Sequence, residues 1–402
     1  MNSVNSLPLR DLLVETKDGD WGQSNPAEGL VPYHVIRATD FAAASLGDVR
    51  SVPLRFLPSH TVQRRTLQLN DVLIETAGGS PGRPTGRTML VTQRVIDSFE
   101  GPVTCASFAR FLRADPRQVD PRFLYWFLQA LYQSGEIEQY QVQHTGVARF
   151  QYTQFAATQH VPVPEVAAQQ AIAEVLGALD DKISTNTKLI KIADTLSHTL
   201  FRSMSQSGTQ LIPLSETARF INGKAFTKNA SGTGRVVIRI AELNSGIGGS
   251  TVYNDIDVDE QHLARPGDLL FAWSGSLTLQ RWFRPEGIVN QHIFKVIPNG
   301  RPLWLVHELL RSKLEEFKSI AADKATTMGH IQRKHLDEPV ALPTSESIRV
   351  HGDLMTGLWE RSLAAEVESL QLAATRDTLL PQLMSGKLRV KDAEKVLEDA
   401  GV

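Results

Sequence analysis

The glycine-rich segment 78–87 combines backbone and side-chain groups that could bind a nucleic acid. It contains Gly79, Ser80, Arg83 and Arg87. Glycine lets backbone N–H groups come close to a phosphate, and each guanidinium can donate hydrogen bonds to a phosphate or to a base edge. The segment lacks the Gly-Lys-Ser/Thr ending of a nucleotide-binding P-loop. The alternative interpretation is a solvated surface loop.

A second set of candidates lies in the C-terminal half of the sequence. Ser274 and Ser276 flank a glycine, and Arg281 follows five residues after Ser276. Two hydroxyl groups beside a glycine suit contacts with phosphate, although a plain β-turn has the same composition. Lys224 and Lys228 flank a phenylalanine, where they could position a phosphate or belong to an ordinary charged surface.

Two further candidate segments stand at equivalent places, each shortly before a long helical pattern. The first contains Thr145 and Arg149. The second is by composition the best candidate for contacts with base edges, and it contains Thr327, His330, Gln332, Arg333 and Lys334. Gln and Arg side chains can each form paired hydrogen bonds with a base in the major groove. The alternative is an ordinary basic connection.

The sequence predicts no catalytic residue and no metal site. Its nearest approach to the Asn/Asp-Pro-Pro-aromatic motif of adenine methyltransferases is Asn25-Pro26-Ala27, which lacks the second proline and the aromatic residue. Cys105 is the only cysteine, so a cysteine-based zinc site is not expected and no internal disulfide can form. Asp71 and Asp268 each precede an apolar run and are expected to cap turns.

The sequence contains an internal repeat: six segments of the first half match segments of the second half in the same order, at an offset of about 180–205 residues. The paired segments are Leu7–Leu9 and Ile212–Leu214, Val35–Phe41 and Val237–Leu243, Asn70–Ile74 and Gly267–Phe271, Gly101–Phe108 and Gly287–Phe294, Pro121 and Pro302, and Val161–Pro164 and Val340–Pro343. In each half, short strand-like runs separated by turn residues are followed by a short helical run. The repeat therefore predicts two similar β-rich domains.

The expected fold class is α+β, with the two β-rich domains separated by two long antiparallel coiled-coil helices. The predicted segments are an N-terminal domain at 1–165, a central helix at 166–205, a C-terminal domain at 206–344, a distal helix at 345–390 and a tail at 391–402. Helices of about 40 residues would be about 60 Å long at 1.5 Å per residue. Two such helices could hold two domains apart.

Apolar residues that alternate by four and three predict the seam of the coiled coil. The seam residues are Ile172, Leu176, Leu179, Ile183, Asn186 and Ile190 in the central helix, and Leu363, Val367 and Leu370 in the distal helix. Asn186 on the seam could fix the register, because a buried amide needs a polar partner. The alternative is an amide turned to the rim of the helix pair.

Composition adds two expectations. The start of the sequence lacks a secretory signal pattern and no run is long and apolar enough to span a bilayer, so a cytoplasmic protein without a membrane partner is expected. The net charge of −2 does not itself indicate nucleic-acid binding, so any affinity must come from local patches or from a partner. In residues 1–165, 14 of the 15 basic residues are arginine, which suits guanine contacts or reflects a compositional bias.

Three segments resemble the specificity subunits of Type I restriction–modification systems. Gln169–Ile183 followed by Asn186 looks like their central helix, and Leu379–Leu388 looks like the end of their distal helix. The segment from Pro266 to Phe271, with Ser274–Ser276 and Asn290–Phe294, resembles their target recognition domain. The resemblance covers essentially the whole chain, and the helix motif is its most specific part.

The resemblance implies a non-catalytic DNA-binding subunit with two target recognition domains, each of which reads half of a bipartite site in double-stranded DNA. The helices would set the gap between the half-sites and dock two modification subunits, with which restriction subunits can associate. S-adenosylmethionine would be bound by the modification subunits, and this chain would bind no cofactor. The alternative function is a repeat scaffold that binds protein partners through its helices and reads no DNA.

Overall fold

The computed structural model describes residues 5–79, 83–143, 147–323, 329–399 and 401. The chain divides into two compact units: unit 1 comprises Met1–Ser184 and Leu372–Val402, and unit 2 comprises Thr185–Gln371. Both divisions fall inside long helices, α6 (Val166–Gln206) and α9 (Ser345–Met384). The domain boundaries expected from the sequence stay predictions.

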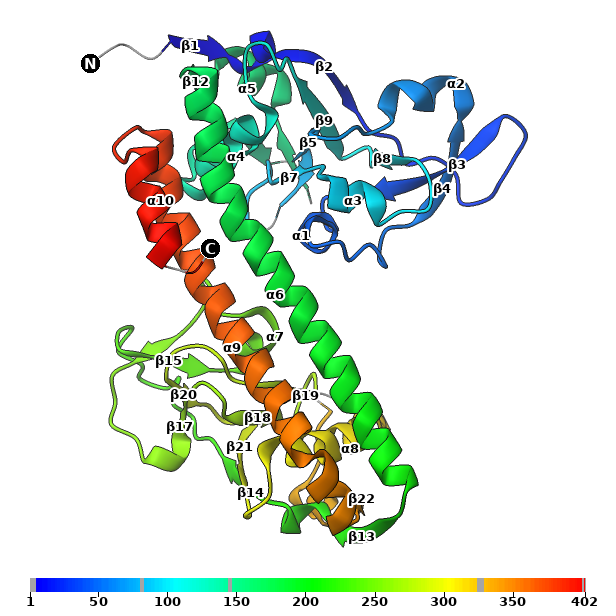
Figure 1. Ribbon diagram of the computed structural model, residues 1–402, viewed down its shortest axis with the longest axis vertical. Helices are drawn as coiled ribbons and strands as arrows, with labels where there is room; N and C mark the ends of the chain where they lie inside the picture. The colour runs from blue at the N-terminus through cyan, green and yellow to red at the C-terminus, as the bar shows by residue number, and fades with distance from the viewer. Residues whose placement is uncertain (1–4, 80–82, 144–146, 324–328, 400, 402) are drawn as a thin grey trace. The chain divides into compact units, whose positions relative to one another are not determined.

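Unit 1 is built from small sheets and short helices (Figure 1). Its strands, in sheet order, are β2 (Leu13–Asp18), β9 (Ala109–Ala114), β5 (Val72–Glu75) and β7 (Thr88–Leu90); β4 (Leu54–Pro58), β3 (Leu30–Ile36) and β8 (Val103–Cys105); β10 (Gln141–Gln143), β11 (Ala148–Phe150) and β6 (Ala77–Gly78); and β1 (Asn5–Pro8) with β12 (His160–Val163). Its helices are η1 (Leu9–Leu12), α1 (Phe41–Ser45), α2 (Ser59–Val62), η2 (Gln63–Arg65), α3 (Gln93–Asp97), α4 (Pro121–Gln133), η3 (Glu136–Tyr140), α5 (Tyr152–Thr158) and α10 (Val390–Asp399).

Unit 2 repeats this plan with fewer elements (Figure 1). Its strands, in sheet order, are β14 (Ala218–Asn222), β21 (Ile293–Pro298), β18 (Leu269–Ala272) and β19 (Thr278–Arg281); β16 (Tyr253–Asn254), β15 (Arg235–Ile238), β20 (Gly287–Val289) and β17 (Leu263–Ala264); and β13 (Thr209–Pro213) with β22 (Pro339–Pro343). Its helices are η4 (Leu214–Glu216), α7 (Ile240–Ser245), η5 (Glu260–His262), α8 (Leu303–Asp323) and η6 (Arg333–Asp337).

The two units share one topology, as the sequence repeat predicts. The sheet order β2-β9-β5-β7 of unit 1 corresponds to β14-β21-β18-β19 of unit 2. Each unit also has one parallel pair, β3 with β8 and β15 with β20, beside antiparallel neighbours. The matched sequence segments fall on equivalent elements: Leu7–Leu9 and Ile212–Leu214, for example, both pass from a strand into a 3₁₀ helix. The α+β fold class with a duplicated plan is therefore confirmed.

A buried arginine–carboxylate pair explains one of the repeated motifs. Arg37 donates to Asp40 from its backbone N–H and its guanidinium at 2.9 Å, and Arg239 does the same to Glu242 at 2.6–3.0 Å. Each guanidinium also donates to a backbone carbonyl, which belongs to Ser51 in unit 1 and to Ser250 in unit 2. Asp40 and Glu242 are 2% and 1% exposed, so these carboxylates depend on their arginine.

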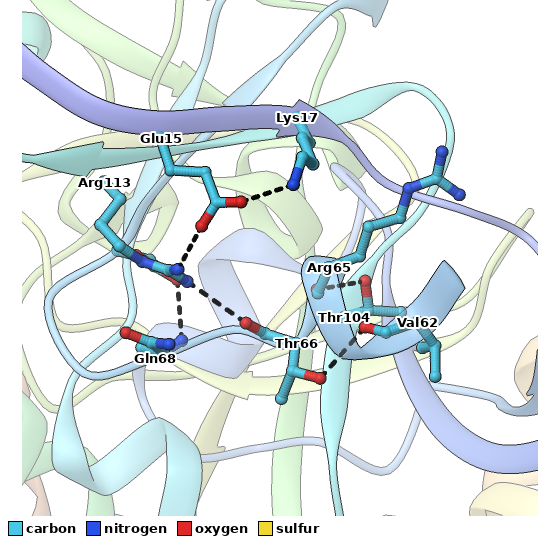
Figure 2. Close-up of polar contacts among 9 residues, drawn as sticks. Glu15, Lys17, Val62, Arg65, Thr66, Gln68, Thr104 and Arg113 are labelled. Atoms are coloured by element: carbon cyan, nitrogen blue, oxygen red, sulfur yellow. Dashed lines mark hydrogen bonds and ion pairs between the residues drawn. The ribbon is translucent and has the colours of Figure 1, made fainter. Parts of the chain in front are cut away.

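A second arginine, Arg113 on β9, joins strands to a loop in unit 1. Its guanidinium donates to both carboxylate oxygens of Asp71 at 2.8 Å, to Glu15 at 2.7 Å and to the carbonyl of Thr66 at 3.3 Å. Figure 2 shows Arg113 between Glu15 and Thr66. Burial lowers the pKa of Arg113, but the hydrogen bond to Asp71 and the negative charges of Asp71 and Glu15 together outweigh burial, so the pKa is raised. These bonds connect the loop at residues 66–71 to strand β9.

The two aspartates expected to cap turns do so. Asp71 accepts the backbone N–H of Gln68 at 2.7 Å, and Asp268 accepts the backbone N–H of Arg265 at 2.7 Å. In both turns the residue before the aspartate has a positive φ: 69° at Asn70 and 102° at Gly267. Asparagine and glycine are the residues that adopt this conformation most readily.

In unit 1, the first part of α6 packs with α4 and with the last part of α9. The predicted seam residues Ile172, Leu176 and Leu179 are buried in one apolar cluster with residues of α4 and α9, and Ile183 packs at its edge. Arg376 on α9 donates to Asp180 on α6 at 2.5 Å. Desolvation raises the pKa of Asp180, although Arg376 opposes the effect.

In unit 2, the seam between α6 and α9 is more polar. Asn186 is 4% exposed and donates to Glu368 at 2.6 Å, so its amide has the polar partner that a seam position requires. Ile190 is half-buried, as are the three predicted seam residues of α9, Leu363, Val367 and Leu370. The buried positions of this part of α9 include Met355, Ser362 and Ala365. Asn186 meets Glu368 in unit 2 and Asp180 meets Arg376 in unit 1, so a segment of α6 packs against a segment of α9 within each unit.

Replacing Glu242 with Gln should destabilise unit 2. Burial alone would raise the pKa of this carboxyl, but the hydrogen bonds and charge of Arg239, together with a hydrogen bond from Thr251, hold the pKa below its ordinary value of 4.5. The stabilisation is therefore fully present above pH 4.5 and is lost as the pH falls through the lower pKa of the folded state. At pH 7 we expect the free energy of unfolding, measured with urea, to fall by about 2–4 kcal/mol.

The same comparison at lower pH checks the cause. The difference between wild type and E242Q should shrink as the pH falls below 4.5 and through the lower pKa of the folded state, below which the wild-type carboxyl is also neutral. Glu315→Gln is the matched control, since Glu315 is 84% exposed and pairs with Lys318, and it should change the free energy of unfolding by less than about 0.5 kcal/mol. A pH-independent difference would show that Glu242 acts by packing.

Candidate nucleic-acid interface

Unit 1 brings two of the predicted DNA-contacting segments together in one sheet. Strand β11 pairs with β6, so that Ala148 lies opposite Gly78 and Arg149 lies opposite Ala77. The backbone N–H of Phe150 also donates to the carbonyl of Thr76 at 2.9 Å. The glycine-rich segment and the segment before the central helix are therefore neighbours, although about 70 residues separate them in the sequence.

Unit 2 makes the same pairing with its own residues. Ser274 forms an antiparallel bridge with His330, and the N–H of Gly275 donates to the carbonyl of Gly329 at 2.9 Å. The N–H of Ile331 donates to the carbonyl of Trp273 at 3.1 Å, as that of Phe150 does in unit 1. His330 is thus the structural counterpart of Arg149, and the equivalence of the two predicted segments holds in three dimensions.

The arginines of this surface in unit 1 have different environments. The side chains of Arg83 and Arg149 are exposed, and Gly79 beside them has a φ of 79°. Arg87 is only 20% exposed, because it donates to both carboxylate oxygens of the buried Glu75 at 2.7 and 2.9 Å. These bonds raise the pKa of Arg87. The predicted residues Ser80 and Thr145 lie outside the described residues.

In unit 2, the exposed cations gather beside η6. Arg333 and Lys334 are exposed and line a hollow of about 530 Å³ together with Arg219 of β14. Gln332 is also exposed, and its backbone N–H donates to Nδ1 of His335 at 3.0 Å, which fixes the start of η6. The predicted residue Thr327 lies outside the described residues.

The turn between β18 and β19 carries the two predicted hydroxyl groups. Ser274 is buried and its hydroxyl has no hydrogen-bond partner among the described residues, whereas Ser276 is exposed and accepts from Asn244 at 2.8 Å. Arg281 lies at the other end of the strand pair, opposite Leu269. The structure therefore does not bring Arg281 together with Ser274 and Ser276.

Arg281 is instead engaged with α9 inside unit 2. Its Nε is 2.8 Å from a carboxylate oxygen of Glu366, and its Nη1 donates to the carbonyl of Trp359 at 3.2 Å. Its guanidinium carbon lies 4.5 Å from the centre of the Trp359 ring. With 10% of its side chain exposed, Arg281 contributes to the packing of α9 in this structure.

Lys224 and Lys228 are exposed on a segment whose backbone is fixed by two amide side chains. Asn290 accepts the N–H of Phe226 at 3.1 Å, and Asn254 donates to the carbonyl of Phe226 at 2.9 Å. Both asparagines are buried. The two lysines are therefore held at the surface of unit 2 by an ordered loop, and a role in phosphate contact stays a prediction.

Sequence reasoning missed residues that border the surface of unit 2. Trp273, Asn222 and His330 line a hollow of about 380 Å³, and the indole N–H of Trp273 donates to Asn222 at 2.8 Å. The ring of Trp273 lies 5.2 Å from that of His292 and 6.3 Å from that of His330, measured between centroids. Trp273 directly follows the apolar run Leu269–Ala272, and Asn222 ends the run Ala218–Asn222, so no motif in the sequence singles out either residue.

The residues that the structure describes lack the patterns of a metal site and of a membrane-spanning helix. They contain no group of three or more His, Cys, Asp or Glu residues placed to hold a metal ion. Among the same residues, no helix combines the length and the apolar character that crossing a bilayer requires.

Comparison with known proteins finds a family model and solved structures that are similar to this chain. Residues 63–193 match the family model described as Type I restriction modification DNA specificity domain. The crystal structure of the S subunit of a Type I restriction–modification system from M. genitalium matches with a TM-score of 0.59 and 16% identity, covering 95% of this chain and 97% of that one. It shows that the fold is shared. The HsdS subunit from Thermoanaerobacter tengcongensis also matches, with a TM-score of 0.36, 15% identity and coverage of 96% and 97%.

No curated protein sequence matches this chain. The family model and the S-subunit fold nevertheless agree with the resemblance that the helix and domain motifs indicated, which is thereby confirmed. DNA contact by the individual residues discussed above stays a prediction.

The double-mutant cycle of Arg281 and Glu366 distinguishes a packing role from DNA contact. Arg281→Met leaves Glu366, which is 16% exposed, without its partner, so we expect the free energy of unfolding to fall by about 2–4 kcal/mol. R281M/E366M should recover at least half of this loss, because no unpaired charge remains. Unchanged stability in R281M, with weaker DNA binding, would contradict the packing role.

Proposed function

We propose that this chain, whose residues 63–193 form a Type I restriction modification DNA specificity domain, is the DNA-sequence-recognition subunit of a Type I restriction–modification complex. Each unit would read one half of a bipartite target in double-stranded DNA. The chain would carry out no chemistry itself. Methyl transfer, with S-adenosylmethionine as donor, would belong to two modification subunits, and cleavage to restriction subunits where they are present.

The observation that carries the proposal is the equivalence of the two surfaces. Arg149 and His330 occupy the same place in two copies of one fold. Arg149 pairs with Ala77 in unit 1, and His330 pairs with Ser274 in unit 2. A shared backbone that presents different side chains suits the reading of two different half-sites. The exposed Arg83 in unit 1 and Arg333 and Lys334 in unit 2 would contact phosphates or base edges.

The long helices support the remaining part of the proposal. Segments of α6 and α9 pack against each other in both units and could connect two DNA-reading surfaces at a set distance. They would also dock the modification subunits in the cytoplasm. Because the net charge is −2, we expect the chain alone to bind DNA weakly and the assembled complex to supply further phosphate contacts.

Mapping methylated adenines in cells that express the chain with its modification subunit tests the function. We expect one split motif, two short specified sequences separated by a gap of constant length. Arg149→Ala should lower discrimination about tenfold at base pairs of one half only, and His330→Ala should do so in the other half only. Lys318→Gln, on α8 outside the proposed surface, is the control and should leave the motif unchanged.

Three outcomes separate the alternatives. A split motif that the two substitutions change independently supports the proposal. Assembly with the modification subunit but no sequence-selective, salt-dependent binding would favour the repeat scaffold. Methyl transfer or cleavage by the purified chain alone would contradict a non-catalytic role.

A further inference from the structure

Unit 1 contains an aromatic pocket that the proposed reading surface does not explain. The pocket has a volume of about 550 Å³ and lies beside β5, β6 and the turn that precedes β9. Trp21 and Phe108 line it, with exposed fractions of 38% and 63%. Two large exposed aromatic rings that line one hollow form an apolar patch, and such patches mark sites of interaction.

The side chain of Arg55 contacts the indole of Trp21 and the backbone around it. The guanidinium carbon of Arg55 lies 4.5 Å from the centre of the Trp21 ring. Arg55 also donates to the carbonyls of Trp21 and Gly22 at 3.1 and 3.2 Å and to the hydroxyl of Ser24 at 2.7 Å. A side chain with this support is preorganised, so a ligand that stacks on it does not have to order it.

Gly19 fixes the approach of the Trp21 loop to the sheet. A Cβ at Gly19 would lie 1.9 Å from the carbonyl oxygen of Cys105, so only glycine fits. The N–H of Asp20 donates to that same carbonyl at 2.9 Å, and Asp20 accepts from Arg65 at 2.6 Å. The loop that carries Trp21 is therefore a rigid turn.

A charged, buried carboxylate lies among the lining residues. Glu75 is 2% exposed, and its two oxygens accept from Arg87, which leaves each oxygen free to accept again. Gly78 makes room for this carboxylate: a Cβ there would lie 2.3 Å from Oε1 of Glu75. The pocket therefore combines aromatic walls with a hydrogen-bond acceptor.

The pocket adjoins the proposed DNA surface. Ala77 and Gly78 line the pocket and belong to β6, which pairs with the strand that carries Arg149. A duplex held by Arg149 and Arg83 would therefore pass close to the Trp21 and Phe108 rings. This continuity favours a nucleic-acid ligand over a protein segment.

Unit 2 does not repeat these residues. Gly223 is the counterpart of Gly19, since a Cβ there would lie 2.1 Å from the carbonyl oxygen of Asn290. The position of Trp21 is then occupied by Ala225. The strand registers likewise place Ala272 at the position of Glu75 and His292 at the position of Phe108. The aromatic pocket is a feature of unit 1, so its ligand would belong to one half-site.

We propose that this pocket takes one nucleobase of the half-site read by unit 1, turned out of the duplex stack. The inference rests on the proposed function. The base would stack against Trp21 and Phe108, which replaces the stacking that it loses in the duplex. Glu75 would accept a hydrogen bond from the exocyclic amine that adenine, cytosine and guanine carry and thymine lacks.

A scan of modified duplexes tests the proposal with the assembled complex. The probes are duplexes of the mapped target in which the nucleotide opposite each position is replaced, one at a time, by an abasic site. Removing the pairing partner lowers the cost of turning a base out, so at one position of one half-site we expect the affinity to rise about tenfold. Trp21→Ala should abolish that rise, whereas Trp21→Phe should retain most of it.

The controls keep the outcomes separate. Phe108→Ala should also reduce the rise, and because Phe108 is 63% exposed its loss should not unfold the unit. Leu54→Ala, at a 49% exposed position outside the pocket, should leave it unchanged. If W21A alters none of the rises, each of them would belong to a base extruded by the modification subunits, and the proposal would be overturned.

The test also distinguishes this inference from the proposed function. If the complex binds its split target selectively but shows no rise that depends on Trp21, the pocket proposal is wrong and the function stands. If the complex shows no selective binding to any duplex, the proposed function itself is wrong.

Discussion

In each unit, one pairing of main-chain groups determines where the candidate recognition residues lie. The N–H of Phe150 donates to the carbonyl of Thr76 in unit 1, and that of Ile331 donates to the carbonyl of Trp273 in unit 2. Backbone hydrogen bonds do not depend on which side chains the paired residues carry. Arg149 can therefore stand where the other unit has His330, and the two surfaces can diverge without loss of the fold.

Buried ion pairs stabilise strand β5, which precedes the paired segment of unit 1. Glu75 and Asp71 lie at the two ends of β5, where each is neutralised by an arginine, Arg87 and Arg113 respectively. Removing one partner of such a pair leaves an unpaired buried charge, which costs far more than a surface ion pair contributes. Arg87 and Arg113 are thus structural, whereas composition alone left contacts with guanine and a compositional bias as alternatives for the arginines of this part of the chain.

The sequence predicted the repeat, the two long helices and the equivalence of the segments around Arg149 and His330. These features depend on local periodicity and on the order of motifs, which a single sequence contains. The contacts of Arg281 with Glu366 and Trp359 were not predicted, because these residues are about 80 positions away in the sequence, and DNA contact by Arg281 stays a prediction. The Trp21 pocket was also not predicted, because its walls come from segments that only the tertiary fold brings together.

Site-specific photo-crosslinking from Arg149 and from His330 tests the central claim most directly. A photoreactive amino acid would replace each residue in turn in the assembled complex, on a duplex that carries the mapped target. The account predicts crosslinks to two different half-sites, separated by the same number of base pairs in every target. Crosslinks from both positions to one half-site, or none to DNA from either, would contradict it.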